Sequence, residues 1–248
     1  MGCFQNTFIT YGIKQGGVFV VFITGDIHGN PTRIIEFAKR SELSDNDLIV
    51  ILGDVGANYF LNRRDNLVKT ELNEIGVPVL CIHGNHEMRP ANIPSYRLTE
   101  WNGGKVWIED EYPHLLFAKD GEIYNIEGNR YIAIGGAYSV DKYYRLAMNY
   151  GWWDDEQPSE EIKQYVEKQL AENEINIVLS HTCPLKYEPT EVFLSQVDQS
   201  KVDKSTEIWL DKIEDNLKYM AWFCGHWHTD KRIDKMHFMF EGWDAVKK

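Results

Sequence analysis

Short apolar runs of strand length recur along the chain, and most end at a polar stretch that contains glycine. The first covers residues 18–23 and is rich in β-branched and aromatic residues, which predicts a buried strand. Comparable runs at 48–52 and 77–82 predict two more strands in the first half. In the second half the same pattern predicts strands at 131–134, 176–179, 219–224 and 236–240.

Amphipathic segments with helix-capping residues alternate with these runs. Asn30 is a suitable cap, and Pro31 a suitable first residue, for a helix whose inner face is Ile34, Ile35, Phe37 and Ala38. Further helices are expected at 65–75, which Gly76 would end, and after Ser159, where Glu160 and Glu161 favour the first turn. A last helix is expected at 206–217. Alternation of strands and helices is typical of a layered α/β domain.

The length of the chain is enough for one domain with a well-buried core. It has 248 residues, of which 43% are hydrophobic. We expect a single domain over residues 18–248, preceded by an N-terminal extension at 1–17, because the first clear element begins at Val18. Residues 136–158 are a candidate cap segment within that domain.

Charge and cysteine content narrow the classes of partner and compartment. The formal net charge of −12 repels nucleic-acid backbones, so nucleic acid is a disfavoured partner unless bound metals or a local basic groove compensate. The four cysteines show no paired spacing, and Cys81 and Cys224 lie in apolar runs, which predicts buried reduced thiols and a cytoplasmic protein. No segment is apolar enough over a sufficient length to span a membrane, and no basic region precedes the first apolar run as in a signal peptide.

Five polar motifs follow the carboxyl ends of predicted strands, where α/β folds place ligand sites. They are Gly25-Asp26-Ile27-His28-Gly29, Gly53-Asp54, Gly84-Asn85-His86-Glu87, Ser180-His181 and Gly225-His226-Trp227-His228. One Gly-Asp pair or a lone histidine would carry little information, but five such motifs in order are unexpected by chance. A mixed set of Asp, Asn and His donors favours divalent transition metals over calcium. Asp54 stands alone at its strand end and has two oxygens to share between two ions.

These motifs resemble the D-x-H, G-D, G-N-H-[DE], H and G-H-x-H blocks of the calcineurin-like metallophosphoesterases. The resemblance extends from residue 26 to residue 228 and implies a four-layer αββα sandwich with two divalent ions. It implies that one ion is held by Asp26, His28, Asp54 and His228. It implies that the other is held by Asp54, Asn85, His181 and His226. Manganese is the expected metal, with iron, zinc, nickel and cobalt as alternatives.

The resemblance also implies hydrolysis of a phosphate ester by a hydroxide that bridges the two ions. His86, which is not a ligand in the family, would protonate the leaving oxygen. Glu87 matches the family's acidic position and would either orient a histidine of the site or be structural. The sequence does not separate monoesters from diesters; we expect a phosphodiesterase acting on small molecules or nucleotides. The oligomeric state is left open.

One departure from the family concerns the phosphate clamp. Protein Ser/Thr phosphatases carry G-D-x-x-D-R-G, whereas residues 53–58 lack the second aspartate and the arginine. This disfavours a phosphoprotein phosphatase and leaves the residues that grip phosphate unassigned. Candidate substrate-binding residues are Asn58, Arg89, Asp141 and Arg145, although the arginines could equally be solvated surface residues.

Residues 135–142 follow another predicted strand and resemble a Gly-Gly-Ala-x-Ser-x-Asp run of a bacterial and phage branch of the family. The tryptophans at 152 and 153 would either stack on a base in the substrate or fill gaps in a packed loop. A non-catalytic scaffold remains the alternative to an enzyme. Every ligand position and His86 are present, which favours the enzyme.

Overall fold

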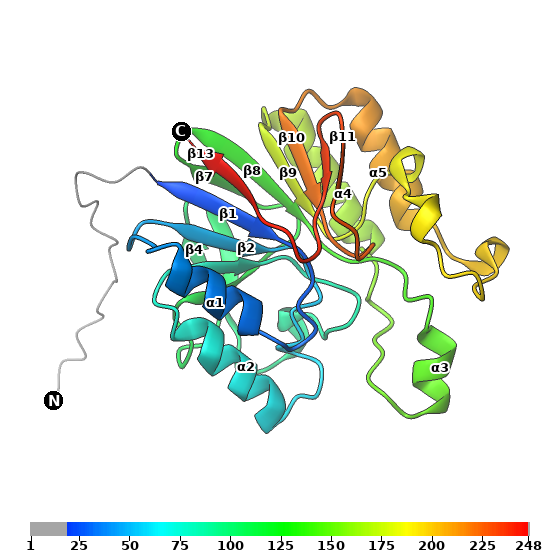
Figure 1. Ribbon diagram of the computed structural model, residues 1–248. Coiled ribbons are helices and arrows are strands. Elements are labelled where there is room, and N and C mark those ends of the chain that lie inside the picture. The colour runs from blue at the N-terminus through cyan, green and yellow to red at the C-terminus, as the bar shows by residue number, and fades with distance from the viewer. Residues whose placement is uncertain (1–18, 248) are drawn as a thin grey trace, which may run out of the picture.

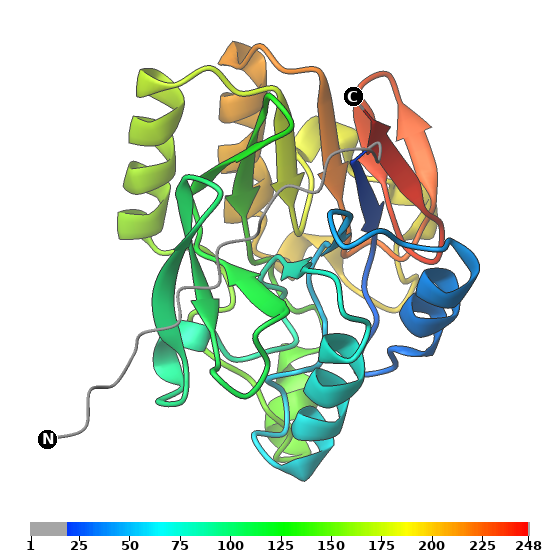
Figure 2. The same cartoon turned by 90° about the vertical axis from the view of Figure 1, so that its left-hand side faces the viewer.

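The computed structural model describes residues 19–247 and consists of two β-sheets packed face to face, with helices outside both. The first sheet is covered by α1 (Thr32–Arg40) and α2 (Arg63–Asn73), and the second by α4 (Glu160–Glu172) and α5 (Ser205–Asn216) (Figures 1 and 2). This is the predicted four-layer αββα sandwich. The extension predicted for residues 1–17 lies outside the described residues.

The first sheet has seven strands in the order β13-β1-β2-β3-β6-β5-β4. Their bounds are β1 (Val20–Thr24), β2 (Leu48–Ile51), β3 (Val79–Cys81), β4 (Arg97–Trp101), β5 (Gly104–Ile108), β6 (Leu115–Ala118) and β13 (Asp244–Lys247). Strands β1, β2, β3 and β6 run parallel, and the other pairings are antiparallel. The carboxyl ends of β1, β2 and β3 therefore meet at one edge.

The second sheet has six strands in the order β11-β12-β10-β9-β8-β7. Their bounds are β7 (Ile123–Ile126), β8 (Asn129–Ile134), β9 (Ile177–Ser180), β10 (Ala221–Cys224), β11 (Lys231–Ile233) and β12 (Met236–Phe238). Strands β8, β9, β10 and β12 run parallel, so β9 and β10 end at the same edge of this sheet.

Three apolar cores separate the four layers, and β2 shows why its sequence is apolar throughout. Leu48 and Val50 belong to the core between the sheets, while Ile49 and Ile51 belong to the core under α1 and α2. A strand buried on both faces needs apolar residues at every position. The third core joins α4 and α5 to the second sheet through residues such as Val166, Leu210 and Trp222.

The predicted strands and helices are confirmed with shifts of at most two residues at their ends. One correction concerns the first helix, which begins at Thr32. Pro31 is therefore its N-cap rather than its first residue, and the Asn30 side chain accepts a hydrogen bond from the Thr32 amide at 3.2 Å. The Ser159 cap is confirmed, since its hydroxyl accepts from the Ile162 amide. Strands β4–β7, β11 and β13 and the six-residue helix α3 (Lys142–Ala147) were not predicted.

Cys81 and Cys224 are buried and unpaired, as predicted, and Cys183 is too, whereas Cys3 falls outside the described residues. Among the helices of residues 19–247, none has the length and apolar character required to cross a membrane.

Candidate metal centre

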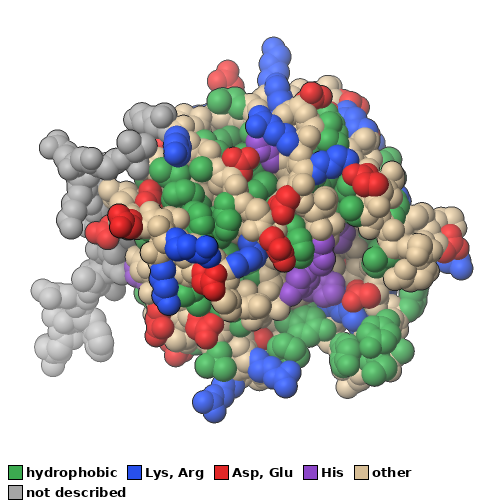
Figure 3. Space-filling model, in the orientation of Figure 1, with side chains coloured by type: hydrophobic (Ala, Val, Ile, Leu, Met, Phe, Trp, Pro, Cys, Tyr) green, Lys and Arg blue, Asp and Glu red, His purple; other side chains and the backbone are tan. Residues whose placement is uncertain are grey.

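The five motifs meet where the two sheets adjoin. Asp26 and His28 follow β1, Asp54 follows β2, and Asn85 follows β3. His181 follows β9, and His226 and His228 follow β10. Five of these side chains, together with His86, line a cavity of about 360 Å³: His28, Asp54, Asn85, His226 and His228. Figure 3 shows histidine side chains gathered in a hollow of the surface.

One group of donor atoms is formed by Asp26, His28 and His228, which lie close enough together to hold a metal ion. The Oδ2 atom of Asp26 is 3.2 Å from Nε2 of His228 and 3.8 Å from Nε2 of His28. The two Nε2 atoms are 2.9 Å apart. Asp26 Oδ2 is buried without a hydrogen-bond partner, which is costly for a carboxylate oxygen unless a cation satisfies it.

A second group is formed around His181, whose Nε2 atom is 3.5 Å from Oδ1 of Asp54 and 2.8 Å from Oδ1 of Asn85. The other oxygen of Asp54, Oδ2, lies 3.9 Å from Nε2 of His28 in the first group. The two oxygens of Asp54 thus face different groups, as expected of a bridging carboxylate.

The tautomer of His181 is suited to metal ligation. Its Nδ1 donates a hydrogen bond to the carbonyl oxygen of Leu52 at 2.7 Å. When the ring is neutral, Nε2 is the nitrogen that carries the lone pair, and it faces the oxygens of Asp54 and Asn85. Three acceptors that point at one another fit a cation between them. The residues present therefore fit the pair of divalent ions that the sequence motifs imply.

The backbone at this edge is held in an unusual conformation. Four of the expected ligands have positive φ: His28 at 45°, Asp54 at 45°, His226 at 66° and His228 at 48°. This left-handed region is unfavourable for side-chain-bearing residues and persists where the surrounding structure enforces it, often at functional sites. The Asp54 turn packs so tightly on Gly84 that a Cβ atom there would lie 2.1 Å from the Asp54 amide nitrogen.

Arg33 of α1, which was not predicted as a site residue, stabilises the turn after β1 through hydrogen bonds. Its guanidinium donates to the carbonyl oxygens of Gly25 and Asp26, both at 2.7 Å, and to the Thr24 hydroxyl. Burial lowers the pKa of Arg33, although the charge of Asp26 opposes this shift. Arg33 lies seven positions after Asp26 in the sequence, and no local pattern indicated its contacts with this turn.

The amide of Asn85 is oriented by two residues of the candidate cap segment. Its Nδ2 donates to the hydroxyl of Ser139 at 2.9 Å, which turns Oδ1 toward His181. Arg145 in turn donates from Nη1 to the same hydroxyl at 3.0 Å and from Nε to the carbonyl of Gly151 at 2.7 Å. Arg145 is buried, so the structure places this candidate behind Asn85 rather than at the cavity surface. Ser139 was not identified from sequence.

Burial and neighbouring charges set the protonation of the site. Burial, with a contribution from His181, lowers the pKa of His226 to about 3, so its imidazole is neutral as a metal ligand must be. Burial acts to raise the pKa of Asp54, but nearby His181, His86 and His28 hold it well below its usual range. Burial also lowers the pKa of His86, aided by Arg145 and opposed by Asp54 and Asp141.

His86 and Asp141 lie together at the cavity. Nε2 of His86 is 3.7 Å from Oδ1 of Asp141, and both residues line the cavity. The backbone amide of His86 donates to Oδ1 of Asp54 at 2.8 Å. Of the four candidate substrate-binding residues, Asp141 is therefore the one that lines this cavity.

The other two candidates, Asn58 and Arg89, point elsewhere. Asn58 is fully buried, and its Oδ1 accepts a hydrogen bond from the Tyr96 hydroxyl at 3.0 Å. Arg89 is also buried; it pairs with Asp120 and donates to the carbonyl of Asp155. It lines a separate cavity of about 280 Å³.

Glu87 lies behind the site and is fully buried. Its Oε1 accepts from the Gly84 amide at 3.1 Å, which helps to shape the motif turn. Burial, followed by the charge of Asp54, raises the pKa of Glu87 to about 8.

Trp152 and Trp153 make their contacts within the loops: the indole of Trp152 donates to Glu156 at 2.7 Å, and Trp153 packs edge-on against Tyr59.

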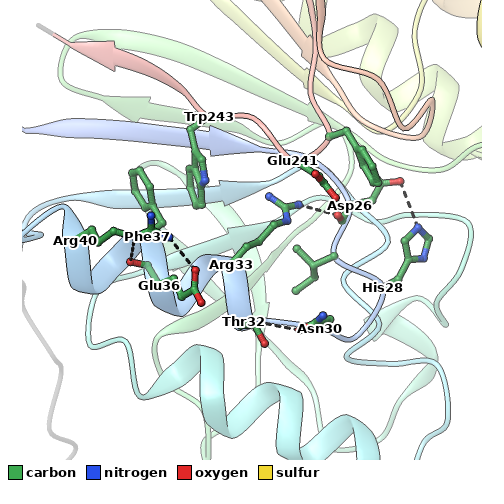
Figure 4. A pocket seen from close by; sticks show the side chains of 12 residues that line it. Asp26, His28, Asn30, Thr32, Arg33, Glu36, Phe37, Arg40, Glu241 and Trp243 are labelled. Carbon is green, nitrogen blue, oxygen red and sulfur yellow. Dashed lines mark hydrogen bonds and ion pairs between the residues drawn. The ribbon is translucent and has the colours of Figure 1, made fainter.

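A larger cavity of about 640 Å³ adjoins Asp26 and His28 on the side of α1. Figure 4 shows Arg33 directed across it toward Asp26, with Glu241 beside them. Its two arginines are engaged, Arg33 with backbone carbonyls and Arg40 with Glu36 at 2.8 Å. Among the described residues, this cavity therefore presents no free guanidinium to a phosphate group.

Comparison with known proteins identifies the family. The sequence model of the calcineurin-like phosphoesterases matches residues 19–230. The chain belongs to this family. As a member it is a metal-dependent hydrolase of phosphoric esters. No curated protein matches this calcineurin-like phosphoesterase in sequence.

Solved structures share its fold at low sequence identity. The protein TT1561 of Thermus thermophilus is 12% identical with a TM-score of 0.52, over 93% of this chain and 99% of that one. The phosphopantetheinyl hydrolase of Mycobacterium tuberculosis is 13% identical with a TM-score of 0.50, over 90% of this chain and 88% of that one. At such identity the likeness establishes the fold alone.

Proposed function

We propose that this calcineurin-like phosphoesterase is a phosphodiesterase that works with two divalent ions, manganese being the expected metal. The observation that carries the proposal is Asp54, whose two oxygens face separate groups of donor atoms. Asp26, His28, Asp54 and His228 would hold one ion, and Asp54, Asn85, His181 and His226 the other.

The charges around the cavity favour diesters over monoesters. Besides the expected ligands, the charged residues that line it are Asp141, Glu188, Glu207 and Lys204. Within the described part of the chain, Lys204 is the one Lys or Arg in that lining, and its Nζ already pairs with Glu188 at 2.6 Å. A phosphate monoester carries up to two negative charges at neutral pH and a diester carries one. The described lining therefore offers no unpaired Lys or Arg for the second charge of a monoester, and none for a nucleic-acid backbone.

When bound, the two ions would polarise the phosphoryl oxygens and activate a water molecule for attack. His86 would donate a proton to the leaving oxygen, because its ring stands at the cavity beside the ligands. Asp141, at 3.7 Å, would position that ring and stabilise its protonated form. Ser139 and Arg145 would keep the amide oxygen of Asn85 directed inward.

The test compares bis-p-nitrophenyl phosphate with p-nitrophenyl phosphate after the protein has been stripped with a chelator and reloaded with Mn²⁺. We expect a larger kcat/KM for the diester and no turnover of either ester by the stripped protein. Parallel reloading with iron, zinc, nickel and cobalt ranks the metals. A preference for the monoester would reject the diesterase assignment. Two bound ions without hydrolysis of either ester would favour the scaffold.

Small-molecule diesters, nucleotides among them, are the substrate class that we propose. A panel of cyclic and linear nucleotide diesters set against phosphopeptides would separate this class from phosphoprotein substrates. The absence of a second Asp and an Arg after Asp54 supports small-molecule diesters over phosphoproteins.

A further inference from the structure

One wall of the cavity that holds the expected metal ligands is apolar. It consists of side chains from three segments, namely Val140, Val192, Phe193, Leu194, Val197 and Trp227, here called the apolar wall. Trp227 stands between His226 and His228 in the sequence, and its ring lies 5.0 Å from that of His226. The wall therefore begins at the metal ligands themselves.

The apolar wall lies on short turns, and ring contacts and ion pairs hold these turns in place. Phe193 stacks on Trp227 with ring centroids 5.5 Å apart and an angle of 21° between the rings. Nζ of Lys204 lies 4.9 Å from the centre of the Phe193 ring while it also pairs with Glu188. Glu191, beside Val192, pairs with a lysine of β11. These contacts hold the apolar side chains in place around the cavity.

Several side chains of the wall remain open to solvent. Val140 is 42% exposed and Leu194 is 53% exposed, although both line the cavity. Isolated exposed apolar residues are ordinary on protein surfaces. A contiguous group that lines a cavity beside convergent polar ligands is instead typical of a binding site for a partly apolar small molecule.

We propose that the apolar wall binds an uncharged, apolar ester group of the substrate while the phosphate lies at the metal ligands. This inference rests on the proposed phosphodiesterase function and specifies its substrate class. The apolar wall and the expected ligands share one cavity, so an ester group of a substrate whose phosphate lies at the ligands would reach the wall. Lys204, the one Lys or Arg of the described lining, is already paired with Glu188 and offers no free charge to a second phosphate, whereas a phenyl or alkyl group would displace water from the wall.

Two probes that differ in one group test the inference. p-Nitrophenyl phenylphosphonate and p-nitrophenyl methylphosphonate have the same leaving group and the same single charge. We expect kcat/KM for the phenyl probe to exceed that for the methyl probe by about tenfold, equivalent to about 1.4 kcal/mol. Because phenylphosphonate and methylphosphonate are not hydrolysed, their binding to the Mn²⁺-loaded protein, measured by calorimetry, gives a readout independent of turnover.

A matched pair of variants locates the preference. The double variant Val192→Ser/Leu194→Ser changes two exposed side chains of the wall, and Leu67→Ser changes a similarly exposed side chain on α2. We expect the double variant to reduce the phenyl preference to about twofold or less in both assays, and Leu67→Ser to leave it unchanged.

The outcomes separate the two proposals. Hydrolysis and binding of both probes with no phenyl preference would overturn the apolar wall as a binding site and leave the phosphodiesterase intact. A phenyl preference that survives in the double variant would also overturn it. Turnover of bis-p-nitrophenyl phosphate without hydrolysis or binding of either probe would overturn the inference alone. Failure to hydrolyse bis-p-nitrophenyl phosphate as well would reject the phosphodiesterase function, and the inference with it.

Discussion

Glu207 provides the sharpest test of the electrostatics of this structure. It lies in the first turn of α5 with 3% of its surface exposed, and its Oε1 accepts a hydrogen bond from the Thr182 hydroxyl at 2.8 Å. Burial raises its pKa from 4.5 to about 7, with a smaller contribution from the charge of Glu188. Folding thus favours the protonated carboxyl, and its hydrogen-bond partner Thr182 is one residue from the expected ligand His181.

The sign and size of the effect on stability follow from linkage. Because the pKa is raised in the folded state, the contribution of Glu207 is fully present below pH 4.5 and is lost as the pH rises through about 7. At 1.36 kcal/mol per pKa unit the total loss is about 3 kcal/mol, of which about 2 kcal/mol falls between pH 5.5 and pH 8.5. Glutamine resembles the protonated carboxyl and does not ionise.

Glu207→Gln should therefore gain stability relative to the wild type as the pH rises. The assay is urea unfolding in the presence of a chelator, at pH 5.5 and pH 8.5, for wild type, Glu207→Gln and the exposed-site control Glu174→Gln. We expect the difference in free energy of unfolding between Glu207→Gln and wild type to grow by about 2 kcal/mol between the two pH values. The corresponding difference for Glu174→Gln should stay constant. A pH-independent difference for Glu207→Gln would refute the reasoning.

Three further variants test the metal centre. Asp54→Asn should lower the bound metal below two ions per chain by elemental analysis and abolish hydrolysis; retention of two ions would contradict the bridging role. His86→Ala should keep both ions but reduce kcat about 10²–10⁴-fold, and full activity would remove His86 from the mechanism. Gly84→Ala would place a Cβ atom 2.1 Å from the Asp54 amide nitrogen. It should reduce metal content with an unchanged far-UV circular dichroism spectrum, and normal metal content would show that the turn can relax.

The sequence indicated several fully buried strands, although β6, every residue of which is buried, was missed. Every residue of β2 is buried, so its apolar run directly indicates a strand. Parallel pairing then brings the strand ends to one edge, which is why motifs far apart in sequence predict one site. The strands that were missed include half-exposed ones: β4 contains Arg97, Thr99 and Glu100 and has no continuous apolar face to reveal it.

Long-range contacts account for what could not be predicted around the metal centre. Ser139 orients Asn85 across 54 positions of sequence, and no local pattern marks a serine for that role. Of the arginines expected at the substrate, Arg89 pairs with Asp120, 31 positions away in the sequence, and Arg145 donates to Gly151 and Ser139. Whether an arginine faces solvent, substrate or core depends on these partners, which exist only in the folded chain.

The division of the expected ligands between the two sheets has a mechanical consequence. Each group takes donors from both sheets: Asp26 and His28 meet His228 at one group, and Asp54 and Asn85 meet His181 at the other. Bound ions would therefore clamp the sheets together, and their binding free energy would add to the cohesion of the sandwich. By the same coupling, a core substitution that shifts one sheet against the other should weaken metal affinity from a distance, without touching a single ligand.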